Sequence, residues 1–128
     1  MTNKKEYTKY RVERARETYQ DALYLAERGS WNSCINRLYY AAFYAIIAML
    51  LSRDIEVKSH AGVKQKLGKE LVKNGILSKE LAKTYSLLFD FRHKGDYDDL
   101  FDFNKEKVEP LIEPVCEIIE IAEHYIKV

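Results

Sequence analysis

A run of fourteen residues without a charge, LYYAAFYAIIAMLL at positions 38–51, most constrains how this chain can fold. A helix of that length is too short to cross a bilayer, which takes about 20 residues. It fits a core helix that neighbouring helices cover on nearly all sides. With 128 residues, 47% of them hydrophobic, the chain can bury such a helix in one domain spanning residues 1–128.

Apolar residues recur at spacings of three and four through most of the chain, the pattern of amphipathic helices. Helices are predicted at about residues 4–28, 31–53, 59–73, 78–95 and 104–127, capped by Ser30, Ser59, Ser78 and Asn104 and stopped by Gly29, Asn74, Gly75 and Gly95. Pro110 and Pro114 predict a kink or a late start in the last helix, and residues 96–103 a loop. The predicted fold class is all-α, an up-down bundle of four to five helices.

Composition excludes several classes of protein. The net charge of +1 gives no reason to expect bulk electrostatic capture of nucleic acid. Cys34 and Cys116 form no CxxC motif and no zinc spacing, so neither a metal site nor a disulfide framework is expected. The N-terminus lacks the apolar segment of a signal peptide. These features predict a cytoplasmic, reduced protein that does not insert into a membrane.

A polar stripe runs along the predicted core helix. Ser33, Arg37, Tyr40 and Tyr44 follow spacings of four, three and four, which places them on one face. A hydroxyl, a guanidinium and two phenols along a buried helix indicate either a binding site or a subunit contact.

A second arginine stands at the end of the fourth predicted helix. Arg92 continues the stripe of Leu81, Tyr85 and Leu88, so its guanidinium should turn toward the helix junction rather than into bulk water. A partly buried guanidinium needs partners, and Asp96 at i+4 or the phenols of Tyr40 and Tyr44 could supply them. A structural ion pair and a phosphate site are both open interpretations, because arginine also grips phosphate bidentately.

Three segments, NRLYYAAFYAIIAMLL, KSHAGVKQKLGKELVKNGIL and FRHKGDYDD, together resemble HEPN-domain proteins. The resemblance is greatest to the small stand-alone branch that is often found beside minimal nucleotidyltransferases. It implies a homodimer in which Arg92 lines a cleft between subunits, a toxin–antitoxin-like role, and no cofactor. The RNA or nucleotide ligand is expected to contact Arg37, Tyr40, Tyr44, His60, Arg92 and His93.

Many members of the family are metal-independent ribonucleases with an arginine followed, after four to six residues, by a histidine. Here Tyr97, Asp98 and Asp99 stand where that histidine would be. The remaining catalytic candidates are Arg92, Asp96 and Tyr97. Asp96 beside an arginine should stay ionised and be a weak base, and Tyr97 should stay protonated at neutral pH.

His93 adjoins Arg92 but points roughly 100° around the helix from it. Arg53 and His60, with six residues between them, match the family spacing by chance, across the loop between two helices. Three functions therefore stay open: an RNA- or nucleotide-binding protein, a ribonuclease with an atypical motif, and a non-catalytic dimeric scaffold whose polar stripe sets the dimer register.

Overall fold

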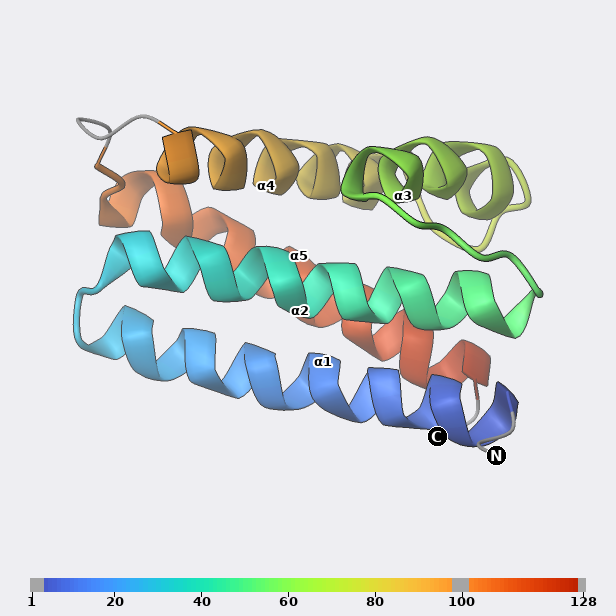
Figure 1. The fold of residues 1–128 in the computed structure, drawn as a ribbon. Coiled ribbons are helices and arrows are strands. Elements are labelled where there is room, and N and C mark those ends of the chain that lie inside the picture. Colours follow the sequence, from blue (N-terminus) through green and yellow to red (C-terminus); the bar gives the residue numbers. More distant parts are fainter. Residues whose placement is uncertain (1–3, 98–101, 127–128) are drawn as a thin grey trace.

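The computed structural model describes residues 4–97 and 102–126, without the side chains of residues 95–97, and over that range it is a helical bundle without strands. Its helices are α1 (Lys4–Glu27), α2 (Trp31–Ser52), α3 (His60–Lys66), the π-helical η1 (Leu67–Val72), α4 (Lys79–Tyr97) and α5 (Lys105–Ile126). α1, α2, α4 and α5 alternate in direction, and α3 folds back beside the start of α4 (Figure 1). The predicted all-α up-down bundle is confirmed.

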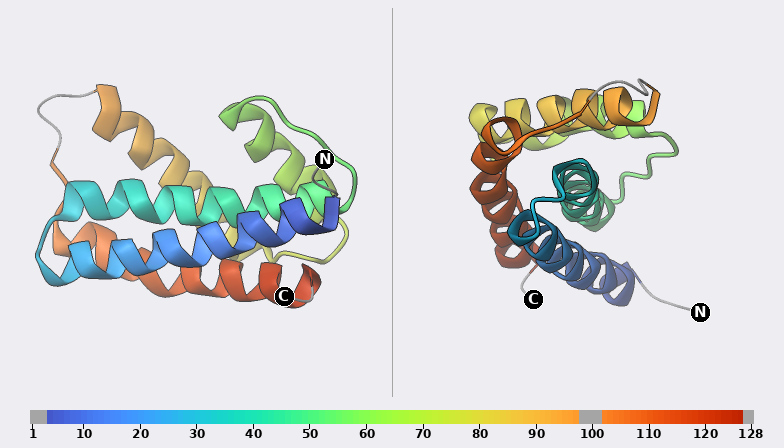
Figure 2. Two further views of the ribbon diagram at one scale, coloured as in Figure 1. Left: turned by 60° about the horizontal axis from the view of Figure 1, so that its bottom comes forward. Right: turned by 90° about the vertical axis from the view of Figure 1, so that its left-hand side faces the viewer.

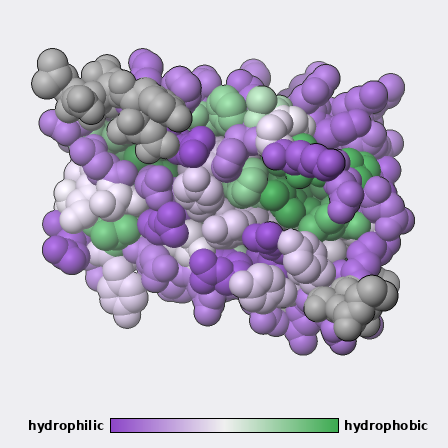
Figure 3. Space-filling model, viewed as in Figure 1, coloured by the Kyte–Doolittle hydropathy of each residue, from purple (hydrophilic) through white to green (hydrophobic). Residues whose placement is uncertain are grey.

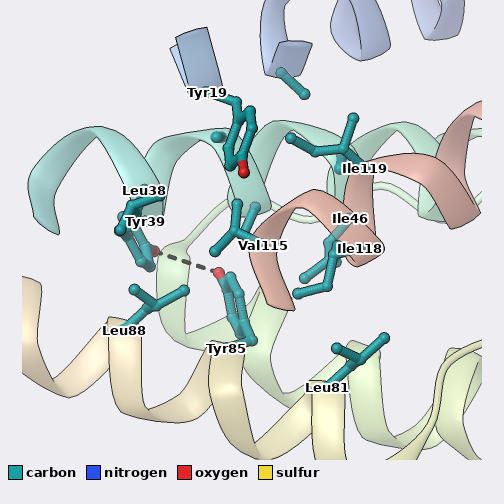
Figure 4. Close-up of a cluster of buried hydrophobic side chains, with 14 of the residues drawn as sticks. Tyr19, Leu38, Tyr39, Ile46, Leu81, Tyr85, Leu88, Val115, Ile118 and Ile119 are labelled. Carbon is teal, nitrogen blue, oxygen red and sulfur yellow. Dashed lines mark hydrogen bonds between the residues drawn. The ribbon is translucent and has the colours of Figure 1, made fainter. Parts of the chain in front are cut away.

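The apolar helix α2 lies at the centre, in contact with α1, α4 and α5. Its side chains Leu38 and Ile46 are fully buried in the cluster that contains Leu88 of α4 and Val115 and Ile119 of α5 (Figure 4). Burying an aliphatic side chain of this size stabilises the fold by roughly 1.5–3 kcal/mol. The sequence of α2 therefore determines the position of every helix around it.

α2 is enclosed on nearly all sides as expected, since Asn32 and Ser33 are its only exposed residues, but one side lacks a covering helix. Viewed along the bundle, α1, α4 and α5 form an arc around α2, and the open side faces the viewer of Figure 1 (Figure 2). Six of the half-buried residues of α2 follow this side: Arg37, Tyr40, Phe43, Tyr44, Ile47 and Leu51. The polar stripe predicted from the sequence is thus the first half of an open face, and Ser33 at its start is exposed.

By length and composition α2 could cross a membrane, since it has 22 residues and an apolar window of 18. In the bundle, however, 61% of that window is buried. Its burial against α1, α4 and α5 is what the core helix of a soluble protein shows.

Three of the four predicted N-terminal caps form, and the exception is Ser30. Ser59 accepts a hydrogen bond from the Gly62 amide (2.9 Å), and Ser78 accepts one from the Leu81 amide (3.1 Å). Asn104 caps α5 in the same way, through the amide of Lys107. Ser30 makes no side-chain cap, and only its carbonyl accepts from Cys34. The stops at Gly29 and Gly75 are confirmed by left-handed φ angles of 75° and 74°.

Three details differ from the expectations, although the bounds of the third helix agree to within one residue. The predicted third helix consists of α3 followed by the π-helical η1. In an α-helix, side chains four residues apart differ by about 40° in direction, and the wider π-turn offsets this difference. Val63, Leu67 and Leu71 therefore all face the core. Gly95 does not end α4, which continues to Tyr97. The expected late start of the last helix is wrong, since α5 begins at once after its Asn104 cap and continues past Pro110 and Pro114 with its apolar side buried between its neighbours. The kink stays a prediction.

Candidate phosphate-binding site

Arg92 projects from α4 toward the N-terminal half of α2. The centre of its guanidinium lies 5.5 Å from the ring centroid of Tyr39 and 5.6 Å from that of Tyr40. The side chain is half-buried, and its Nε atom is inaccessible to solvent. Contact with two aromatic rings stabilises a cation by roughly 0.5–2 kcal/mol and limits the directions in which it can point. The expectation that this guanidinium turns toward the tyrosines of the long helix is confirmed for Tyr40, whereas its other ring contact is Tyr39.

A second cation shares the Tyr40 ring. Arg37, one helical turn before Tyr40, places its guanidinium 5.3 Å from the Tyr40 centroid. Its Nε and Nη2 atoms donate to Oδ1 of Asn36 at 3.2 and 2.8 Å. Two guanidinium groups on one aromatic ring create a local positive potential that the net charge of the chain does not reveal.

His60 of α3 contacts the same aromatic cluster. Its ring stacks on Phe43 with centroids 4.5 Å apart and lies edge-on to Tyr40 at 6.0 Å. Its Nδ1 atom is 2.7 Å from the hydroxyl of Tyr39. Burial, and next the positive charge of Arg92, lower the pKa of His60, so the imidazole is neutral at neutral pH.

A chain of hydrogen bonds determines which nitrogen of His60 carries the proton. Burial raises the pKa of Tyr39 and of Tyr85, so both phenols stay protonated. Tyr85 donates to the Tyr39 oxygen at 3.3 Å (Figure 4), which leaves the Tyr39 proton for Nδ1 of His60. With Tyr39 as the donor in this pair, the imidazole is the tautomer that carries its proton on Nε2 and offers one N–H donor.

Tyr44 belongs to this cluster, since its ring centroid lies 6.0 Å from those of Tyr40 and Phe43, whereas the other predicted site residues lie apart from it or outside the described side chains. Tyr44 lies one turn beyond Tyr40 and is approached by Arg11 and Arg14 of α1, at 5.6 and 5.8 Å, rather than by Arg92. His93 is exposed on α4. The backbone of Asp96 and Tyr97 completes α4, but their side chains are not among those described, so both stay catalytic predictions.

The chance pairing of Arg53 and His60 forms no site. Arg53 follows the C-terminal end of α2 and donates to the Tyr125 hydroxyl at 3.2 Å. Arg53 comes about sixteen residues after Arg37, which is roughly 24 Å along the helix axis, so it lies far from the Arg37 end of α2. The described residues contain no group of three or more His, Cys, Asp or Glu side chains that could hold a metal ion.

Two buried phenols were not predicted as part of the site. Tyr39 and Tyr85 fall on the core sides of their helices, so the apolar pattern marks them as packing residues. The spacing of seven between Tyr85 and Arg92 was a usable signal, since it places both on one side of α4.

The fold and the site together describe an all-α bundle in which the junction of α2, α3 and α4 holds two arginines and a neutral histidine around a tyrosine pair. Residues 8–125 match the model of the HEPN domain. The chain is 35% identical to a UPF0332 protein of Thermotoga maritima over 127 residues, covering 99% of this chain and 96% of that one. The chain belongs to the HEPN-domain family.

Further relatives carry other names. Over 101 residues the chain is 30% identical to "Putative toxin MJ0142" of Methanocaldococcus jannaschii, covering 79% of this chain and 69% of that protein. It is 33% identical over 86 residues to the UPF0332 protein glr0978 of Gloeobacter violaceus, covering 67% and 68%.

The position of His60 beside a fixed cation gives a titration that tests this geometry. Replacing Arg92 by Gln removes a positive charge that disfavours the imidazolium, so the pKa of His60 should rise in Arg92→Gln relative to the wild type. NMR of the imidazole resonances across pH measures this value directly. An unchanged or lowered pKa of His60 in the variant would contradict the placement of Arg92.

The same shift has a consequence for stability. Because the pKa of His60 is lower in the folded chain than its usual 6.5, the unfolded chain binds the proton more readily. The contribution of His60 to the free energy of unfolding is therefore complete above about pH 6.5 and is lost as the pH falls toward the folded pKa. Urea unfolding at a series of pH values, with Arg92→Gln as the comparison, should show a smaller loss in the variant.

Proposed function

We propose that this protein binds single-stranded RNA by gripping a backbone phosphate between Arg92, Arg37 and His60. The observation that carries the proposal is the Arg92 guanidinium, half-buried and seated on the rings of Tyr39 and Tyr40. A guanidinium held in this way is pre-organised to donate two parallel hydrogen bonds to a phosphate.

The neighbouring groups suit the same ligand. Arg37 supplies a second cation on the Tyr40 ring, and His60 supplies a neutral N–H donor. Tyr40 and Phe43 are half-buried, and aromatic rings interleaved with cations are typical of sites that bind single strands. Because the cations are concentrated at one junction, binding does not require a high net charge.

Binding accounts for this arrangement better than cleavage does. A general base needs a free lone pair near the 2′-hydroxyl, and the hydrogen-bond chain from Tyr85 leaves His60 with a proton on Nε2. The atypical ribonuclease is the second candidate, favoured by the closeness of a neutral imidazole to Arg92. It requires His60 to exchange its tautomer or another group to act as base.

A toxin role in the cytoplasm completes the proposal. Relatives named as putative toxins support this role, and the free cysteines Cys34 and Cys116 suit a reducing compartment. A minimal nucleotidyltransferase as the cognate partner rests on the resemblance to stand-alone HEPN proteins.

We also propose that two copies pair through the C-terminal half of the open face of α2. Ile47 and Leu51 of α2, with Ile55 and Val57 of the following linker, form the apolar part of a hollow of about 670 Å³ beside α1, which charged residues also line: Lys4, Arg11, Asp54, Glu56 and Lys58. An apolar patch is visible on the right of the molecule (Figure 3). A two-fold axis through this patch would bury it on itself and leave the Arg92 end of α2 open to RNA, unlike the dimer that the resemblance implies, in which Arg92 lines the cleft between subunits.

The phosphate grip is tested by RNA affinity in EDTA at about 50 mM salt. For a labelled single-stranded dodecamer, Arg92→Ala should weaken binding at least about tenfold, since a hydrogen bond to a charged group contributes about 1.5–3 kcal/mol. The slope of log K against log salt should flatten by about 0.7, the value for one phosphate that is no longer neutralised. Arg92→Lys should recover part of the affinity.

Arg53→Ala is the matched control, because Arg53 lies at the opposite end of α2, and it should bind as the wild type does. Equal affinity of Arg92→Ala and the wild type would end the proposal. RNA cleavage by the wild type that Arg92→Ala lacks would replace binding by the ribonuclease.

Pairing is tested by molar mass in solution. A glutamate at position 47 places a charge in the middle of the apolar patch, so Ile47→Glu should convert a wild-type dimer into a monomer in light scattering after gel filtration. Leu87→Glu, which puts the same charge at an exposed leucine of α4, should leave the dimer intact. A monomeric wild type, or a dimer that tolerates Ile47→Glu, would contradict this interface.

A further inference from the structure

A second hollow adjoins Arg92 and Arg37 and is not lined by His60. Its volume is about 390 Å³, and it lies between the first two turns of α2, the end of α4 and the segment before α5. Its polar lining is Asn32, Ser33, Asn36, Arg37 and Arg92, and the buried ring of Phe103 adds an apolar wall. The volume falls near the lower end of the roughly 300–1,000 Å³ of small-molecule sites, which suits one nucleotide unit rather than an oligonucleotide.

The amide oxygens of this hollow are already in use. Oδ1 of Asn32 accepts from the Phe103 amide at 2.8 Å, while its Nδ2 donates to Asp102. Oδ1 of Asn36 accepts both bonds from Arg37. A guanidinium has only donors, so the Asn36 atom that faces it must be the oxygen. The amino group of Asn36 is therefore what this side chain can still offer a ligand.

The polar lining is thus rich in donors and poor in acceptors. The two guanidinium groups and the Asn36 amino group can only donate, and the Ser33 hydroxyl can do either. A base edge with carbonyl acceptors, O6 and N7 of guanine or O4 of uracil, matches these groups, and arginine binds the guanine edge bidentately. Adenine and cytosine would direct exocyclic amino groups at donors and lose their hydrogen bonds to water.

We propose that this hollow is a base-specific subsite for a keto nucleobase, guanine or uracil, on the nucleotide next to the phosphate held by Arg92. The subsite rests on the proposed RNA-binding function, because Arg92 serves both the phosphate and the wall of the hollow. Asn36 is the specificity-determining residue, and Arg37 fixes its orientation.

The test is a set of labelled single-stranded RNA dodecamers, oligo(A) and the same strand with one central residue changed to guanine, inosine, uracil or cytosine. The full-length protein should bind the guanine, inosine and uracil strands about five- to twentyfold more tightly than the adenine and cytosine strands. Inosine keeps O6 and N7 but lacks the 2-amino group, so its agreement with guanine identifies the carbonyl edge as the recognised feature.

Asn36→Asp replaces the amino donor by an acceptor of the same shape, so the guanine-to-adenine affinity ratio should fall to about one. Gln20→Glu makes the same amide-to-carboxylate change on the exposed side of α1 and should keep the ratio. Comparing ratios cancels the effect of the added negative charge on affinity.

The outcomes distinguish failure of the base subsite from failure of the RNA-binding function on which it rests. Equal binding of all five strands, with Arg92→Ala still weakening each of them, would overturn the base subsite and leave phosphate binding intact. A preference for keto bases that survives Asn36→Asp would also overturn the assignment to this hollow. Absence of binding to any strand would overturn the RNA-binding function, and the subsite with it.

Discussion

The stacking of the Arg92 guanidinium on the Tyr39–Tyr40 pair is the interaction on which the function proposed for this protein depends. The rings are held in place by the burial of α2, and Tyr39 is further fixed by hydrogen bonds with Tyr85 and His60. A cation in such a setting has lost most of its conformational freedom before a ligand arrives. The entropy cost of ordering an arginine on binding, about 0.5–1.5 kcal/mol, is largely met during folding.

The open face of α2 divides into two parts of different chemistry. Around Arg37 and Tyr40 it carries cations interleaved with aromatic rings. Around Ile47 and Leu51 it is an apolar patch next to the linker. Both parts lie on one rigid helix, so a partner bound at the apolar end and a nucleic acid bound at the charged end would be held in fixed relation to each other.

Much of the fold could be predicted because helix periodicity and caps are local properties. The side chains of Ser59 and Asn104 accept from backbone amides three residues away, so sequence alone reveals them. The π-turn of η1 could not be predicted, since it depends on keeping Leu67 and Leu71 on one core. The role of Tyr39 could not be predicted either, because its hydroxyl forms hydrogen bonds with residues 21 and 46 positions away in the chain. In the sequence, a buried tyrosine whose hydroxyl forms such bonds has the same apolar pattern as one that only packs in the core.

The most direct measurement of the central claim is a double-mutant cycle in RNA-binding free energy, combining Arg92→Ala with Tyr40→Leu. If the Tyr40 ring positions the Arg92 guanidinium, Tyr40→Leu should reduce the RNA-binding free energy less in the Arg92→Ala background than in the wild type. The coupling energy between the two substitutions should then be at least about 0.5–1 kcal/mol. Circular dichroism of each variant shows whether the bundle is retained. Two effects that simply add would mean that Arg92 acts without the tyrosine, which would contradict the proposed grip.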